Sequence, residues 1–106
     1  MIKIPKREKV NDSRSILANK FCDFIMQSCN NDLDAAVADV ISNKYYDLFD
    51  NCMRNFYETV DIDKEIPLFV YAENLKHGKD LYGVSDEEHA ENLEICRSAC
   101  IEYYMK

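Results

Sequence analysis

The chain of 106 residues is long enough for one domain with a single core and too short for two. Apolar residues make up 47% and charged residues 31%, a composition that excludes a Pro-rich disordered chain. The net charge of −7 is unevenly distributed, because residues 1–30 hold six Lys or Arg and three Asp or Glu, whereas residues 31–106 hold seven and seventeen.

Turn-forming residues are scarce, with two Gly and two Pro in the whole chain. A β-sandwich or barrel needs many more of them, so we expect an all-α fold. We predict a compact bundle of about five helices joined by short loops. A basic N-terminal arm over residues 1–10 precedes the single helical domain, which covers residues 11–106.

The first two predicted helices lie on either side of an Asn pair. Capping residues before an apolar repeat predict a helix over residues 13–29, which Asn30 and Asn31 end. The residues that recur at helical spacing in it are Leu17, Phe21, Phe24, Ile25 and Ser28. Asn31 then serves as the N-cap of a second helix with acids in its first turn. The expected core positions of that helix are Leu33, Ala36, Val37, Val40 and Ile41.

A third helix is predicted over residues 44–59, after an interruption at Ser42 and Asn43. A fourth helix starts at Pro67, since proline suits the first helical turn. Its inward positions are Leu68, Phe69, Ala72 and Leu75, and a strand over residues 66–71 is the competing interpretation.

The last helix is predicted from local signals at both of its sides. Gly78 is expected to cap the preceding helix, and Ser85 with Glu88 forms a capping box. The helix then continues to about Tyr104. Its expected core positions are Ala90, Leu93, Cys96, Cys100 and Tyr103.

Cysteine spacing predicts buried, reduced thiols rather than disulfides, because five cysteines occupy apolar positions in helix-like segments. They are Cys22, Cys29, Cys52, Cys96 and Cys100. His89, Cys96 and Cys100 share one helical face, but no second ligand pair accompanies them, so we expect a core stripe and no metal site. No phosphate-binding glycine loop or activated nucleophile is evident, and we therefore expect no enzyme and no cofactor.

The N-terminus lacks an apolar stretch that would make it a secretory signal, and the chain lacks a run of about 18 apolar residues that could cross a bilayer. We therefore expect a cytoplasmic protein without a membrane partner. The net negative charge repels nucleic acid, so direct nucleic-acid binding is not expected.

Acidic residues on the predicted helices are the main candidates for partner binding. They can serve as a solvated polar face, or they can form a row that a basic, nucleic-acid-binding surface of another protein recognises. The candidate residues are Asp32, Asp34, Asp39, Asp47, Asp50 and Glu58.

Tyrosine pairs support an alternative, a helical interaction module or homodimer that docks through aromatic contacts, since Tyr is enriched at interfaces. Its candidate residues are Tyr45, Tyr46, Tyr103 and Tyr104. The same tyrosines also fit half-buried positions at the edge of the core.

One segment resembles a known family. Asp32-Leu33, Ala36-Val37 and then Asn43, Tyr45-Tyr46, Asp47 and Phe49 resemble a helical segment of the phage Ocr-type DNA-mimic antirestriction proteins, over about residues 31–53. The resemblance implies a small phage or mobile-element inhibitor that occupies the DNA-binding channel of a host defence enzyme. The chain differs from that family in its thirteen Lys or Arg and in its ending, IEYYMK. A shorter acidic patch directed at one protein is therefore expected, rather than mimicry of a long duplex.

Overall fold

The computed structural model describes Ile2, Ile4 and residues 13–43, 66–78 and 83–105. Every regular element within these residues is an α-helix, which confirms the all-α prediction. The helices are α1 (Ser13–Ser28), α2 (Leu33–Ser42), α5 (Pro67–His77) and α6 (Asp86–Tyr104). The described residues thus contain four helices rather than about five, and the helix predicted over residues 44–59 lies outside them.

The turn between α1 and α2 uses two consecutive asparagines with left-handed backbone. Asn30 has a φ of 56° and Asn31 a φ of 59°, a region that asparagine tolerates better than most residues. The Asn31 N–H donates to the carbonyl oxygen of Met26 at 2.8 Å and closes the end of α1. The prediction of Asn31 as the N-cap of α2 is wrong: Asp32 is the cap, and its Oδ1 accepts from the Ala35 N–H at 3.2 Å.

Helix α5 is the most deeply buried helix in the described part of the chain. Every side chain from Ile66 to Asn74 is buried, and Pro67 occupies the first turn, where its missing N–H leaves no helical bond unmade. The competing strand over residues 66–71 is therefore wrong. A helix that is buried on all sides reads as a continuous apolar run, which is why the same letters also fit a strand.

The ends of α5 and α6 follow the predicted capping residues. Gly78 caps α5 with a φ of 66°, and its N–H donates to the Asn74 carbonyl. The Ser85 Oγ accepts from the Glu88 N–H at 3.2 Å and begins α6. None of the helices described is long and apolar enough to cross a membrane.

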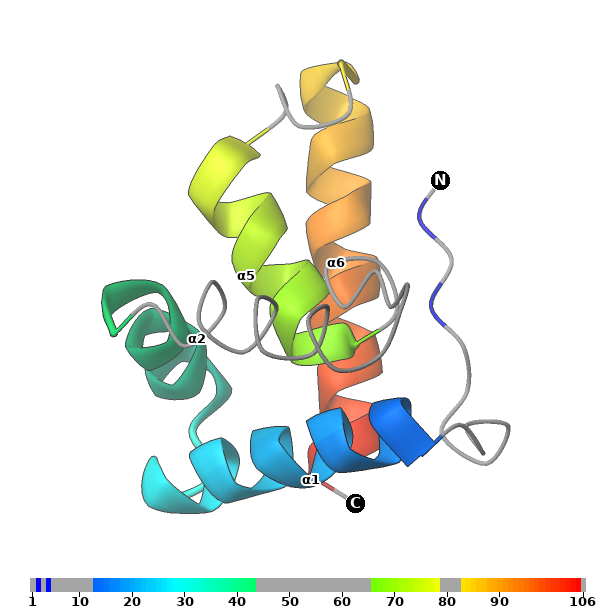
Figure 1. The fold of residues 1–106 in the computed structure, drawn as a ribbon. Coiled ribbons are helices and arrows are strands. Elements are labelled where there is room, and N and C mark those ends of the chain that lie inside the picture. Colours follow the sequence, from blue (N-terminus) through cyan, green and yellow to red (C-terminus); the bar gives the residue numbers. More distant parts are fainter. Residues whose placement is uncertain (1, 3, 5–12, 44–65, 79–82, 106) are drawn as a thin grey trace.

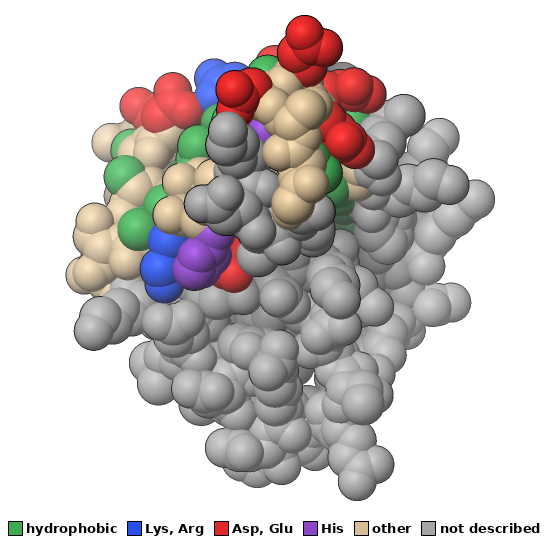
Figure 2. All heavy atoms as spheres, turned by 90° about the horizontal axis from the view of Figure 1, so that it is seen from above, with side chains coloured by type: hydrophobic (Ala, Val, Ile, Leu, Met, Phe, Trp, Pro, Cys, Tyr) green, Lys and Arg blue, Asp and Glu red, His purple; other side chains and the backbone are tan. Residues whose placement is uncertain are grey.

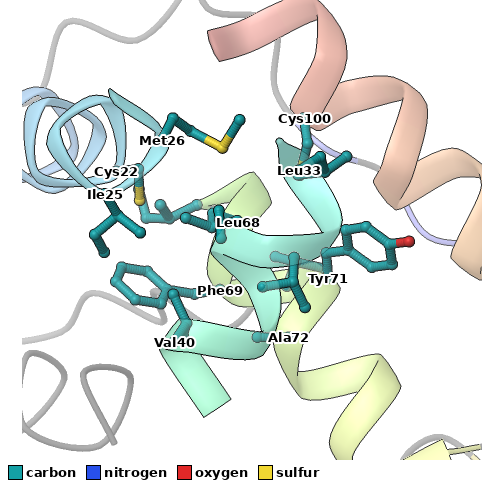
Figure 3. Close-up of a cluster of buried hydrophobic side chains, with 14 of the residues drawn as sticks. Cys22, Ile25, Met26, Leu33, Val40, Leu68, Phe69, Tyr71, Ala72 and Cys100 are labelled. Carbon is teal, nitrogen blue, oxygen red and sulfur yellow. The ribbon is translucent and has the colours of Figure 1, made fainter. Parts of the chain in front are cut away.

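The four helices enclose one core. Figure 1 shows α5 and α6 side by side with opposite chain directions, α2 against α5, and α1 crossing near the end of α6. Figure 3 shows Ile25 of α1, Val40 of α2 and Phe69 of α5 converging in the interior. The Cα radius of gyration is 13.0 Å, close to the ~13 Å of a folded chain of this length.

Several expected core positions are exposed instead. Leu17 is 48% exposed, Phe24 65% and Leu75 44%, and Ala90 also faces solvent. On α1 the buried stripe consists of Ala18, Cys22, Ile25 and Met26. Both stripes have helical spacing, and the structure buries the one whose small residues let α1 approach its neighbours closely.

Hydrogen bonds tie residues near both ends of the chain to the helices. The Ile2 N–H donates to the Asn92 Oδ1 at 3.3 Å, and Ile2 and Ile4 pack against the core. These two residues of the predicted arm therefore belong to the packed structure, and the rest of the arm lies outside the described ranges. Near the end of α6, the Tyr104 hydroxyl donates to the Asn19 Oδ1 at 2.8 Å and ties α6 to α1.

Candidate functional site

The first half of α6 carries a dense group of acids. Asp86, Glu87 and Glu88 fill the first turn behind the Ser85 cap, where negative charge interacts favourably with the helix dipole. Over its whole length α6 holds six Asp or Glu and one Arg. Helix α6 therefore carries more acidic residues than α2, which holds Asp34 and Asp39 and is capped by Asp32.

Four of the glutamates form what we term the α6 acidic row, defined as Glu87, Glu91, Glu94 and Glu102. All four side chains are exposed. At ~100° and ~1.5 Å per residue they lie within an arc of about 80° and span about 22 Å along the helix. Figure 2 looks down on the end of the molecule where α6 begins and shows Asp and Glu side chains gathered there.

The single cation of α6 turns away from this row. The Arg97 Nη1 donates to the Asp34 Oδ1 at 2.6 Å and to the Tyr71 hydroxyl at 3.4 Å. Hydrogen bonds to Tyr71 and Asp34 raise the pKa of Arg97 above its usual range. Among the described residues no cation pairs with the α6 acidic row, so its charge faces solvent.

The acids predicted on α2 do not form a single row. Asp32 is the N-cap and Asp34 pairs with Arg97, while Asp39 accepts a hydrogen bond from the Asn43 side chain. Asp34 and Asp39 are about 140° apart around the helix axis at ~100° per residue. Asp34 and Asp39 therefore lie on different sides of α2. The other predicted acids, Asp47, Asp50 and Glu58, lie outside the described residues.

The tyrosines at the end of α6 serve as packing residues. Tyr103 is 3% exposed, and Tyr104 is partly buried with its hydroxyl bound to Asn19. Their ring centroids are 5.8 Å apart. Tyr103 thus lies in the core and Tyr104 at its edge, and neither side chain is in the exposed class. Tyr45 and Tyr46 fall in a part of the chain that the structure does not describe.

The described cysteines have the environment of inert thiols. Burial raises the pKa of Cys96 to about 11 and raises that of Cys100, with further increases from the neighbouring Cys22 and Cys96 thiols. Cys29 is partly exposed, and burial followed by the charges of Asp39 and Asp32 raises its pKa too. These thiols are therefore protonated at neutral pH, which disfavours nucleophilic chemistry.

His89 is partly exposed at the start of α6, while Cys96 and Cys100 of the same predicted stripe are fully buried. In the described ranges no group of three or more His, Cys, Asp or Glu residues could hold a metal ion. His77 is exposed, and its Nε2 lies 3.1 Å from the Glu73 Oε1. Cys52 is beyond the described ranges.

A second surface feature lies between α1 and α2. A pocket of about 130 Å³ is lined by Phe21, Phe24, Ile25 and Ser28 of α1 and by Asp39 of α2. The Ser28 hydroxyl donates to the Phe24 carbonyl at 2.9 Å. Sequence reasoning assigned Phe24 to the core and missed the pocket, because the pocket depends on how α2 packs beside α1.

The α6 acidic row was also missed, although its signal is visible in the sequence. Glu87, Glu91 and Glu94 recur at spacings of four and three, the period of one helix face. No protein-family model, no curated protein and no solved structure matches this chain. Its function must therefore be inferred from its own residues.

Proposed function

We propose that this chain is a small, non-enzymatic acidic protein that binds a protein partner through α6. The partner presents a basic surface of the kind that contacts nucleic-acid phosphates. The α6 acidic row carries the proposal, since four exposed glutamates share one side of a helix whose opposite side is packed in the core. A helix anchored in this way holds the charges in a fixed arrangement.

Electrostatics supply both affinity and selectivity in this proposal. A net charge of −7 attracts a basic partner at long range and speeds their encounter. At contact, the glutamates take the places that phosphates occupy on the partner's Lys and Arg side chains. The interaction must then weaken with salt, because exposed charges are screened over about 8 Å at physiological ionic strength.

The resemblance to the phage Ocr-type proteins extends the proposal to inhibition of a host defence enzyme by DNA mimicry. Of the segment that carries this resemblance, the structure describes residues 31–43, where Asp32 caps α2 and Asp34 pairs with Arg97. The α6 acidic row lies outside that segment and adds a second set of acids. We propose that the two sets act on the same basic, nucleic-acid-binding partner in the bacterial cytoplasm.

The test replaces Glu87, Glu91 and Glu94 together with Gln, which keeps side-chain size and removes three charges. Immobilised wild-type protein should retain proteins from a bacterial lysate that duplex DNA or a salt step releases. The Gln variant should retain at least tenfold less of them, because each lost contact weakens binding and the contacts act together.

A matched control removes three charges outside both acidic sets, with Asn at Asp12, Asp23 and Asp63. This control should retain the partner nearly as well as wild type, which separates the α6 acidic row from net charge. Circular dichroism should show unchanged helix content in both variants. Retention that resists both salt and duplex DNA, or equal loss in the two variants, would contradict the proposal.

Exposed apolar residues on α1 favour a second candidate, a module that docks through apolar contacts. Leu17 is 48% exposed and Phe24 65% exposed, on the same side of the helix. Binding by this route should be insensitive to salt and should be lost on Phe24→Ala. The lysate experiment distinguishes it from the first candidate, since the α6 Gln variant would then bind normally.

A further inference from the structure

The α1–α2 pocket combines an apolar lining with a carboxylate. Phe21, Phe24 and Ile25 supply hydrophobic walls on the α1 side, and Asp39 supplies the acid from α2. Its volume of about 130 Å³ is similar to that of a cavity of ~150 Å³ that holds one benzene ring. The pocket therefore suits one side chain rather than a cofactor.

The pocket exists because α1 buries the stripe of Ala18, Cys22, Ile25 and Met26 and leaves Phe24 outside it. Ile25 points to the core at 2% exposure, and Phe24, one residue earlier, is left 65% exposed beside it. Phe21, one turn before Ile25, is half-buried between these two directions. The exposed ring of Phe24 thus forms an outer wall of the pocket.

Two aspartates place negative charge at this junction. Asp39 is partly buried, with its Oδ1 bound to the Asn43 amide, and Asp32 caps the same helix nearby. Burial, followed by the charges of Asp39 and Asp32, raises the pKa of the Cys29 thiol, which is next to Ser28 of the pocket in sequence. Lys20 is exposed one turn before Phe24 on α1.

We propose that the α1–α2 pocket receives the side chain of a single Lys or Arg from the protein partner. The methylene stem packs against Phe21, Phe24 and Ile25, and the cationic head lies at Asp39. Lys and Arg side chains are suited to such a site, since they bury an apolar stem while the charged head stays at the rim. The face of Phe24 adds a cation–π attraction.

Other occupants fit less well. A carboxylate would be repelled by Asp39 and Asp32, and an uncharged aliphatic chain would gain no ion pair. A second copy of this chain, paired through α1 about a two-fold axis near Lys20, would bring two like charges together. The inference rests on the proposed function in one respect, namely that the partner is a basic protein.

The experiment uses small probes and full-length, isotope-labelled protein. Amide chemical shifts are followed by NMR during titration with n-pentylammonium, 1-pentanol and pentanoate. Pentylammonium should shift the amides of Phe21, Phe24, Ile25, Ser28 and Asp39 in a saturable manner. Pentanol should bind about threefold more weakly, the size of one exposed ion pair, and pentanoate should not bind.

Asp39→Asn is the matched variant, because asparagine keeps the Oδ1 that accepts from Asn43 and removes only the charge. In this variant pentylammonium and pentanol should bind equally. Phe24→Ala should weaken both probes. Equal binding of the two probes to wild type, or an unchanged preference in Asp39→Asn, would overturn the inference.

The two proposals can fail separately. If pentylammonium binds as expected while the α6 Gln variant retains the lysate proteins fully, the proposed function fails and the pocket stands. If the Gln variant loses those proteins while pentylammonium shifts no amide up to about 50 mM, well beyond a millimolar dissociation constant, the pocket inference fails. The α6 proposal is then unaffected.

Discussion

Among single residues, the buried thiols link this structure most directly to a measurable pH dependence. Cys96 and Cys100 are 0% exposed on the inner side of α6, and burial raises the pKa of both. A thiol is easier to bury than a thiolate, because an ion loses its hydration in the interior. The core therefore tolerates these cysteines only in their protonated form.

Alkaline conditions should destabilise the protein through Cys96. Its pKa is about 11 in the folded state against 9.0 for an ordinary thiol. Below pH 9 both states hold the proton, and between pH 9 and 11 only the folded state does, so the free energy of unfolding falls as pH rises. The contribution of Cys96 should be on the order of 3 kcal/mol, because each tenfold change in proton affinity corresponds to about 1.4 kcal/mol.

Urea unfolding at several pH values between 7 and 11 would measure this fall. Cys96→Ala should lower the stability at pH 7 and flatten its decline above pH 9. Cys29→Ala serves as a control, because Cys29 is only partly buried and should affect the slope less. A slope that is the same in Cys96→Ala and in the parent would contradict the assigned pKa.

At the scale of the helix, the packing of α1 gives a paired prediction. Ile25 is 2% exposed and Leu17 is 48% exposed, although both belong to the same apolar repeat. Ile25→Ala should destabilise the protein by about 2–5 kcal/mol, and Leu17→Ala should have an effect of about 0.5 kcal/mol or less. Chemical denaturation monitored by circular dichroism would measure both changes.

Comparable losses of stability in the two variants would mean that α1 buries the whole stripe expected from sequence alone. A second pair provides an independent check, since Phe69 is 0% exposed in α5 and Phe24 is 65% exposed in α1. Replacing Phe69 with Ala should cost about 3–5 kcal/mol. Replacing Phe24 with Ala should affect probe binding rather than folding.

The start and end of α5 and the start of α6 could be predicted from sequence because their chemistry is local. Pro67, Gly78 and Ser85 each act through their own backbone or one neighbouring turn, and the structure places each at the predicted helix end. Helix faces were harder to predict. The repeat on α1 has two overlapping apolar stripes, and only contacts with α2, α5 and α6 decide which one is buried.

The features of the candidate site likewise differ in whether local sequence spacing can predict them. The period of Glu87, Glu91 and Glu94 is a local signal that sequence alone contains. The ion pair of Arg97 with Asp34 spans 63 positions, and the pocket joins Phe24 to Asp39 across two helices. Neither follows from local spacing, because both depend on how helices pack.

For the molecule as a whole, the exposed acidic row and the exposed apolar side chains of Leu17 and Phe24 lie on different helices. The α6 acidic row faces solvent from the last helix, and the exposed Leu17 and Phe24 belong to the first. Arg97 of α6 pairs with Asp34 of α2 and also donates to the Tyr71 hydroxyl of α5. The fold thus offers one surface for electrostatic contact and another for a single side chain.

The hydrogen bond from Tyr104 to Asn19 also has a kinetic consequence. It joins positions 85 apart, whereas α5 and α6 are neighbours in sequence and form the most extensive helix pair described. Contacts that close such long loops tend to form late in folding. We therefore expect α5 and α6 to associate first and α1 to dock afterwards. Tyr104→Phe should then leave the refolding rate nearly unchanged in stopped-flow experiments and accelerate unfolding severalfold; a slowed refolding rate would instead place α1 in the folding nucleus.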